Sequence, residues 1–459
     1  MIAFVALCAF ALAWVLLLLD VDPVPTWFYV FAWYPVLVLA DVFVRRMGRG
    51  SAIFRSPAQV ASLFGWSAVI WLVFEVANFR LGNWYYVFLP ARSVERWGGI
   101  LISFATVVPA VILAERTLAT LGVGRRWSTA PLPHRPQDLT SIQGLGLGMA
   151  ALAMLFPRTF FPLVWGAAWL LVDPIVWRYR PAWSLLADLA RGEWGRLGRL
   201  MLGGLGIGLL WEFLNFWARG KWVYSVPWLE GTKLFEMPPL GFLGFPFFAL
   251  EAWAMYHLLC VIGIAVPASG GPGRQDLSRP TRRVLGIAPR VVASVPLAVV
   301  FAAITLLGME RRTISSVGPE IREMPGISEA ETAAITGAGI GSPFALAKAR
   351  PSSVATRTGL PPARAAQLVE LSRLVTLRGI GANHTTRLHE LGVSTVCALA
   401  RWPPAVLWRA YHSRDPERGT RSLPGPMRPT TAEVRMWIGT ARRECTERWE
   451  THASPGPGN

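Results

Sequence analysis

Carboxylates within or at the ends of long apolar segments are the residues of this sequence that could do chemistry. Glu75 precedes Asn78 by three residues, which places the acid and the amide on one face of a helix. Glu212 and Asn215 repeat this spacing. A charged group at the centre of a membrane helix costs about 2.5–3.5 kcal/mol on insertion scales, so such groups need a compensating role. The other acids in similar settings are Asp41, Asp173, Glu115 and Glu251.

The chemistry open to these acids is proton transfer to or from an apolar substrate. A carboxyl group in apolar surroundings can deliver a proton at neutral pH, and aromatic ring faces stabilise a positive intermediate. The candidate acids and bases are Glu75, Glu212, Glu115 and Glu251. The side chains expected to orient them are Asn78 and Asn215. The candidate substrate-binding residues are Trp84, Tyr85, Trp211 and Trp222.

Both sets of residues have a purely structural alternative. The acids could form hydrogen bonds between helices, which contribute roughly 0.6–2 kcal/mol each in membranes; we favour a functional site for them. The aromatic residues cluster where apolar segments end, so an aromatic belt at the membrane interface explains them more simply. That set comprises Trp71, Trp84, Tyr85, Tyr86, Trp211, Trp217, Trp222, Tyr224 and Trp228.

The composition is that of an all-α protein of the membrane. The chain has 459 residues, of which 53% are hydrophobic and only 16% charged, and its mean hydropathy is +0.39. Runs long enough to span the hydrocarbon layer as helices recur along the chain. We expect nine spans, at 2–19, 27–44, 58–77, 99–119, 140–156, 161–177, 199–217, 240–262 and 291–309. The first apolar segment lacks the features of a cleaved signal peptide, so we expect it to stay.

The first eight spans form two similar halves, 1–122 and 140–263. Glu75 and Asn78 recur as Glu212 and Asn215 at an offset of about 137 residues. The other acids echo one another as well. An even number of spans per half predicts parallel repeats, an arrangement known from transporters but not limited to them.

The net charge of +17 is concentrated in alternate connections. The basic connections are 45–55, 120–139, 178–198 and 266–290. Basic loops face the cytoplasm, so we expect a multi-pass protein of the bacterial cytoplasmic (inner) membrane with its N-terminus inside. Nine spans place the C-terminal tail outside. If the fifth and sixth segments formed one span, the tail would be cytoplasmic.

The C-terminal part begins with a Gly/Pro-rich basic linker, 264–290, and a ninth membrane helix, 291–309. A helical tail domain, 310–446, and a disordered end, 447–459, should follow. The segments 325–347 and 378–400 match at an offset of 53 residues, with Gly326 against Gly379 and Gly339 against Gly392. Over about 320–445 the tail resembles tandem helix-hairpin-helix domains. The resemblance implies either protein contacts or self-association, which we favour, or DNA binding.

The membrane half resembles the membrane-bound lycopene cyclases and related carotenoid-modifying proteins. The resemblance covers 1–263 and rests on the duplicated, Trp/Tyr-rich helices that carry carboxylates. It implies protonation of an isoprenoid or other lipid by buried acids. The Pro-x-Glu-Glu pattern of that family is absent from this sequence; the nearest stretches are "LPARSVE" and "VPWLE".

Three function classes remain open: modification of a membrane lipid or other hydrophobic small molecule, proton-coupled transport, and a membrane scaffold that presents the tail. We expect no cofactor and no metal, because no metal-ligand or nucleotide motif occurs. The four cysteines lack redox spacing and are expected to be structural thiols. Two glycine pairs in apolar helices should allow close helix packing, namely Gly144 with Gly148 and Gly204 with Gly208. His257 should be packed rather than a ligand.

Overall fold

A computed structural model describes the chain except for 50–52, 134–135, 227–232, 269–286, 414–428 and 454–459. Most of the predicted linker 264–290, the last residues of the predicted disordered end and Trp228 lie outside the described residues. The fold is all-α, as predicted. Among the described residues, eight helices are long and apolar enough to cross a membrane. They coincide with eight of the nine predicted spans; the segment 2–19 forms a shorter apolar helix of 17 residues.

The helices of the membrane part follow one another along the chain with few interruptions. They are α1 Ile2–Leu18, α2 Phe28–Val44, α3 Pro57–Leu81, α4 Ser93–Phe104, α5 Val107–Thr120, α6 Pro136–Leu155, α7 Pro157–Phe160, α8 Val164–Tyr179, α9 Leu185–Ala190, α10 Gly195–Trp217, α11 Gly244–Val261 and α12 Ile287–Arg312. Short π or 3-10 turns adjoin them: η1 Arg45–Arg49, η2 Phe161–Leu163, η3 Pro181–Trp183 and η4 Pro239–Leu243. α6 and α8 are separate helices that pack against each other, so the fifth and sixth segments are not one span.

The chain divides into two compact units. The first, called here the membrane unit, comprises Met1–Asn83, Trp97–Ala218 and Gly231–Gly308. The second, called here the composite unit, comprises Trp84–Arg96, Arg219–Glu230 and Met309–Asn459. The composite unit thus joins the tail with one connection from each membrane half, which the sequence did not indicate.

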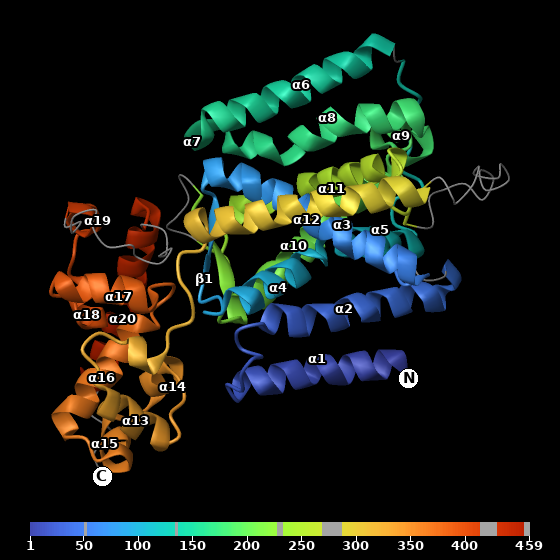
Figure 1. The fold of residues 1–459 in the computed structure, drawn as a ribbon. Helices are drawn as coiled ribbons and strands as arrows, with labels where there is room; N and C mark the ends of the chain where they lie inside the picture. The colour runs from blue at the N-terminus through green and yellow to red at the C-terminus, as the bar shows by residue number, and fades with distance from the viewer. Residues whose placement is uncertain (50–52, 134–135, 227–232, 269–286, 414–428, 454–459) are drawn as a thin grey trace. The chain divides into compact units, whose positions relative to one another are not determined.

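Among the described residues, the first half of the membrane unit contains three candidate spans after the shorter α1, and the second half contains four. α1 lies beside α2, and α6 beside α8, at opposite edges of the bundle (Figure 1). The core contains a repeated ring contact: Trp33 on α2 and Trp211 on α10 have centroids 5.8 Å apart, and Trp165 on α8 and Phe74 on α3 are also 5.8 Å apart. Each half therefore brings a ring of its third span into contact with a ring of the second span of the other half.

Glycines set the closest helix contacts of the membrane unit. A Cβ on Gly204 would lie 2.6 Å from the Phe245 carbonyl oxygen, and one on Gly208 would lie 2.3 Å from the Phe245 ring. α10 can approach α11 there only because both positions lack a side chain. The prediction for Gly144 and Gly148 is wrong, since nothing lies within 4 Å of either Cβ position. Gly146 makes the close contact instead, since a Cβ there would lie 2.7 Å from the backbone nitrogen of Leu171.

Two short strands, β1 Trp84–Val87 and β2 Lys221–Tyr224, pair antiparallel in the composite unit. Trp84 lies opposite Tyr224, and Val87 lies opposite Lys221. An offset of about 137 residues converts the first pair into the second, so the equivalent strands of the two halves pair symmetrically. The segment 313–318 runs along the other edge of β1, where the Tyr86 backbone N–H donates to the Thr313 carbonyl at 2.7 Å.

The described part of the tail consists of two repeats of four helices each. The first follows a 3-10 turn, η7 Ile321–Glu323, and contains α13 Glu329–Gly337, α14 Pro343–Lys348, α15 Pro351–Thr358 and α16 Pro362–Val375. The second contains α17 Gly381–Glu390, α18 Val396–Ala400, α19 Pro404–Ser413 and α20 Thr431–Ala453. α20 continues past residue 446, where disorder was expected to begin.

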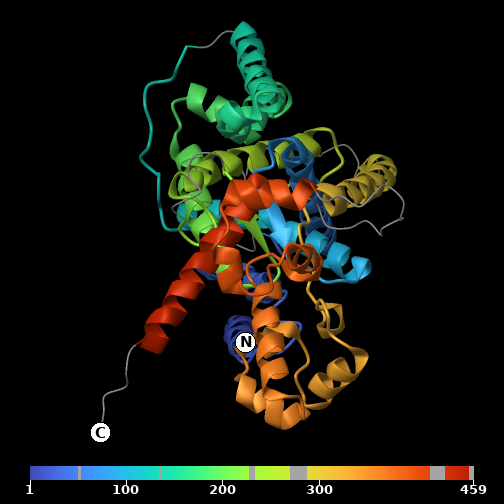
Figure 2. The same ribbon diagram turned by 90° about the vertical axis from the view of Figure 1, so that its left-hand side faces the viewer.

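Each tail repeat has a hydrophobic core of its own. Leu346 is fully buried in the first core and Trp437 in the second. The turns correspond as well, because Gly339 and Gly392 both adopt positive φ, at 75° and 81°, where a glycine is least strained. Figure 2 shows the two repeats as neighbouring groups of helices, the first in orange and the second toward red.

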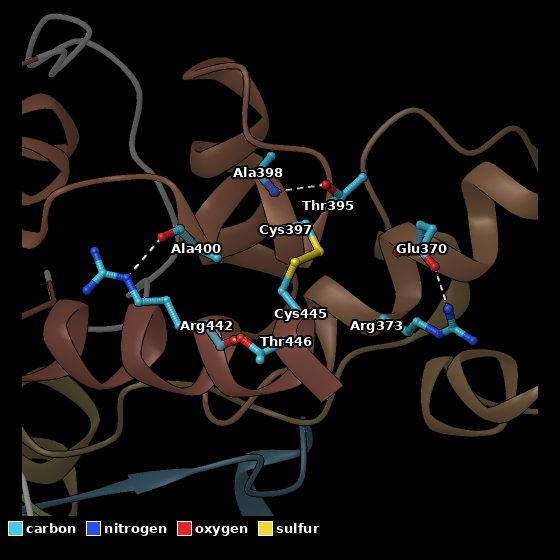
Figure 3. Close-up of a disulfide and its surroundings, with 9 residues drawn as sticks. All are labelled: Glu370, Arg373, Thr395, Cys397, Ala398, Ala400, Arg442, Cys445 and Thr446. Atoms are coloured by element: carbon cyan, nitrogen blue, oxygen red, sulfur yellow. Dashed lines mark hydrogen bonds and ion pairs between the residues drawn. A yellow bond between two sulfur atoms is a disulfide. The ribbon is translucent and has the colours of Figure 1, made fainter. Parts of the chain in front are cut away.

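A disulfide joins Cys397 on α18 to Cys445 on α20, with Cα atoms 5.4 Å apart (Figure 3). The prediction that all cysteines are thiols is therefore wrong for this pair, whereas Cys8 and Cys260 are free. Beside the disulfide, the Thr395 hydroxyl accepts a hydrogen bond from the Ala398 N–H and caps α18. The second repeat is thus closed covalently between its second and last helices.

Candidate functional site: buried acids and an aromatic cluster

Phe248 on α11 lies at the centre of an aromatic cluster in the membrane unit. Its ring centroid lies 5.4 Å from Trp71, 5.4 Å from Phe74 and 6.1 Å from Trp211. Trp165 closes the cluster at 6.1 Å. These rings come from α3, α8, α10 and α11, so both halves contribute.

Glu75 is fully buried on α3 beside this cluster. Its Oε1 accepts a hydrogen bond of 3.0 Å from the indole N–H of Trp71, one helical turn earlier. Trp71 in turn contacts Phe248. A buried carboxyl group that accepts a hydrogen bond from an indole N–H is a polar group in an apolar region. This is the setting expected of a proton donor or acceptor.

Glu212, the counterpart of Glu75, is fully buried on α10. It interacts electrostatically with Tyr29 on α2, whose hydroxyl is hydrogen-bonded to Thr106. The preceding residue, Trp211, contacts Phe245 and Phe248. Glu75 and Glu212 therefore flank one aromatic cluster from opposite halves.

Glu251 has an identifiable structural task. Its Oε1 accepts a hydrogen bond of 2.9 Å from the backbone N–H of Ala168. Ala168 follows a break in α8, where Gly166 has φ of 106°. The carboxyl group thus caps the first turn after the break, where backbone N–H groups lack helical partners.

Glu115 forms an ion pair, whereas Glu251 accepts from a backbone N–H. The Arg199 guanidinium on α10 lies 2.7 Å from its Oε1, and Arg116 lies 3.8 Å from its Oε2. Arg199 also donates to the Val123 carbonyl just after α5. Since a buried carboxylate needs such a partner, Glu115 and Arg199 hold α5 and α10 together. The sequence did not indicate Arg199.

Asp41 and Asp173 perform the same structural task in the two halves. Asp41 accepts from the Ile53 backbone N–H at 3.2 Å, and Asp173 accepts from the Leu185 backbone N–H at 3.2 Å, both twelve residues further along the chain. Asp173 accepts two further hydrogen bonds, from the Ser184 hydroxyl at 2.6 Å and the Leu186 N–H at 2.8 Å. Both aspartates fix the connection that follows their helix.

The asparagines lie close to the ends of their helices. Asn78 Oδ1 accepts from the Asn83 backbone N–H at 2.8 Å and holds the chain at the end of α3, where Gly82 adopts φ of 63°. Asn215 is fully buried near the end of α10. For Asn78, the observed contact is that of a C-terminal cap.

The aromatic candidates separate between the two units. Trp211 belongs to the cluster around Phe248, whereas Trp84, Tyr85 and Trp222 lie on the paired strands of the composite unit. Tyr85 is buried against the tail, and its hydroxyl lies 3.6 Å from the Met436 sulfur. An interfacial belt is therefore the wrong explanation for Trp84 and Tyr85, which are only 4% and 3% exposed.

A second buried polar cluster, which the sequence did not indicate, lies in the composite unit. His384 on α17 donates from Nε2 to the Ser315 carbonyl at 3.0 Å, and its Nδ1 accepts from the Tyr411 hydroxyl at 2.7 Å. Burial lowers the pKa of His384 to about 4, so the ring is neutral at pH 7. Burial also raises the pKa of Glu433, which accepts from the Thr430 N–H. This cluster fastens the segment 313–318 to the second tail repeat.

The described residues contain no group of three His, Cys, Asp or Glu side chains able to hold a metal ion. His257 packs 4.2 Å from the Trp253 ring, as expected of a packed histidine. A family model described as a domain of unknown function (DUF4332) matches residues 325–444, which lie within the tail. No curated protein and no solved structure matches the chain.

Proposed function

We propose that the protein is a membrane scaffold that presents the composite unit as a rigid interaction module. The observation that carries this proposal is the make-up of that unit, in which strands from both membrane halves pair with each other and pack with the tail. Three separate stretches of chain thus enter one module. A flexible tether would need only the single link after α12.

Two observations support a position outside the cytoplasm. The three segments of the module are separated along the chain by even numbers of candidate spans, which supports a common side of the membrane, opposite the basic connections. Disulfides persist in oxidising compartments, and the module contains Cys397–Cys445. Alkaline phosphatase fused after residue 310 should be active, and inactivity of this fusion would contradict the topology.

The module's partner is a protein or a second copy rather than DNA. In helix-hairpin-helix domains, which the tail resembles, the glycine turns can offer backbone N–H groups to phosphates. In the second repeat this turn contacts the protein itself: a Cβ on Gly379 would lie 2.7 Å from Val87, and one on Gly381 would lie 3.0 Å from Ser316. A phosphate would have to displace these contacts.

Complementation of a deletion strain tests the scaffold proposal. Removal of 311–459 should abolish function, while the double variant Glu75→Gln, Glu212→Gln should retain it, because the amides keep the shape of the bundle. The reverse pattern would refute the scaffold and favour chemistry in the bundle.

The second candidate is acid–base modification of an isoprenoid or other apolar lipid, as the resemblance to lycopene cyclases implies. It is supported by the placement of Glu75 and Glu212 on two sides of the cluster around Phe248. Lipid analysis of strains carrying Glu212→Gln should then show an accumulated precursor. A strain carrying Glu193→Gln, which alters an exposed acid, is the matched control and should show none.

A further inference from the structure

The two equivalent ring contacts in the core of the membrane unit differ in polarity. Trp33 and Trp211 form one contact, and Trp165 and Phe74 form the other at the same separation of 5.8 Å. The two contacts occupy corresponding positions of the two halves, so Trp211 in the first contact stands where Phe74 stands in the second. The site between α2 and α10 therefore carries an additional hydrogen-bond donor.

These two indoles are buried donors that the described part of the chain does not satisfy. Trp33 is 1% exposed and Trp211 is 4% exposed, yet neither Nε1 donates to an acceptor among the described residues. Other indoles do have acceptors: Trp66 donates to the Ile264 carbonyl and Trp253 to the Trp183 carbonyl. Trp169 and Trp437 also have no acceptor among the described residues, but only Trp33 and Trp211 are in ring contact with each other. An unsatisfied buried donor costs about 1–3 kcal/mol, so two in ring contact require an explanation.

Further polar groups gather at the same place. Tyr29 stacks on Trp33 with centroids 6.0 Å apart, and Glu212 follows Trp211 directly and interacts with Tyr29. On the other side, Glu75 receives its hydrogen bond from Trp71. Gly208 stands one helical turn before Glu212, where Trp71 stands before Glu75. Trp71 thus donates to the acid on its own helix, whereas Trp33 and Trp211 have no acceptor among the described residues.

We propose that Trp33 and Trp211 bind the carbonyl oxygen of a neutral, ring-bearing apolar molecule. A carbonyl has two acceptor lone pairs, and the aromatic surroundings suit a flat ring in offset or edge contact. An anionic ligand is disfavoured because a charged group would lose its hydration in this buried, aromatic region. This inference deepens the second candidate function by naming its ligand class, and it is independent of the scaffold role.

The test uses the full-length protein in detergent and two matched probes, an alkyl naphthoquinone and the corresponding alkyl naphthalene. The quinone should bind saturably and more tightly than the naphthalene, and its carbonyl infrared band should shift to lower wavenumber. Trp33→Phe with Trp211→Phe should weaken quinone binding about 30-fold, since each neutral hydrogen bond contributes about 1 kcal/mol and 1.4 kcal/mol is tenfold. Naphthalene binding should stay unchanged.

Trp217→Phe is the control variant, because Trp217 lies on the same helix and is 46% exposed. Each single variant, Trp33→Phe or Trp211→Phe, should weaken quinone binding about five-fold, which keeps the test available if the double variant does not fold. Equal binding of both probes, an unshifted carbonyl band, or no saturable binding would overturn the proposal and leave buried water as the partner of the indoles. If the quinone binds but the strain carrying Glu212→Gln accumulates no lipid precursor, the binding site would stand and the acid–base function would be refuted.

Discussion

Breaking the tail disulfide should loosen the second tail repeat selectively. The change is Cys397→Ser with Cys445→Ser, which removes a covalent link across a sequence separation of 48 residues. In the chain-entropy treatment, a loop of this length stabilises the folded state by about 4 kcal/mol, chiefly by restricting the unfolded chain. That free energy corresponds to about three powers of ten in the opening equilibrium.

Amide hydrogen exchange of the full-length protein in detergent measures this opening helix by helix. Amides of α18 and α20 should exchange up to about 1000-fold faster in the double variant. Amides of α14 and α16 provide the internal control, since the first repeat has its own core. A change below about ten-fold in α20, or an equal change in both repeats, would refute the assignment of an independent, disulfide-closed second repeat.

Three other changes test the packing and the buried polar groups. Gly208→Val should destabilise the membrane unit by about 1–3 kcal/mol, because its side chain would overlap the Phe245 ring; thermal inactivation in detergent should occur at lower temperature. Asp173→Ala should cost about 3 kcal/mol by stranding three donors, the Ser184 hydroxyl and the backbone N–H groups of Leu185 and Leu186; the same heating assay measures the loss. The pKa of His384 is about 4 in the folded state, below its ordinary 6.5, so its contribution is complete above pH 6.5 and is lost as pH falls toward 4. Amide exchange of α17 should show this loss, by about 3 kcal/mol at most, and His384→Gln should remove it.

The pH comparison isolates the histidine because both proteins keep Glu433. The raised pKa of Glu433 acts in the opposite direction, since its neutral form is favoured in the folded state as pH falls. The difference between wild type and His384→Gln therefore reports His384 alone. An unchanged pH dependence in the variant would mean that the ring does not titrate in this range.

Helices and repeats could be predicted from the sequence because both leave local, periodic signals. Spans follow from apolar runs of sufficient length, and Gly339 and Gly392 mark matching turns because each adopts positive φ. The repetition of Glu75 as Glu212 likewise indicated equivalent helices before any contact was known.

Pairings across long sequence distances could not be predicted. β1 and β2 are four residues each and follow long apolar helices, so their aromatic residues look like an interfacial belt until the partner strand is known. The ion pair of Glu115 with Arg199 and the disulfide of Cys397 with Cys445 join elements whose spacing carries no motif. Buried acids indicated polar contacts, but whether each one caps a backbone, pairs with arginine or faces the aromatic cluster depends on tertiary packing.

A cross-link between β1 and the second tail repeat tests the central claim most directly, namely that strands and tail form one module in an oxidising compartment. A Cβ on Gly379 would lie 3.4 Å from the Val87 Cβ, close to the separation found in disulfides, about 3.5–4.5 Å. In the double variant Val87→Cys, Gly379→Cys, with a protease site inserted between 269 and 286, the two fragments should stay joined without added oxidant and separate on reduction. The control Val87→Cys, Gly392→Cys should release its fragments, because Val87 is not within 4 Å of Gly392. Fragments of the Gly379 variant that separate without reductant would contradict the account.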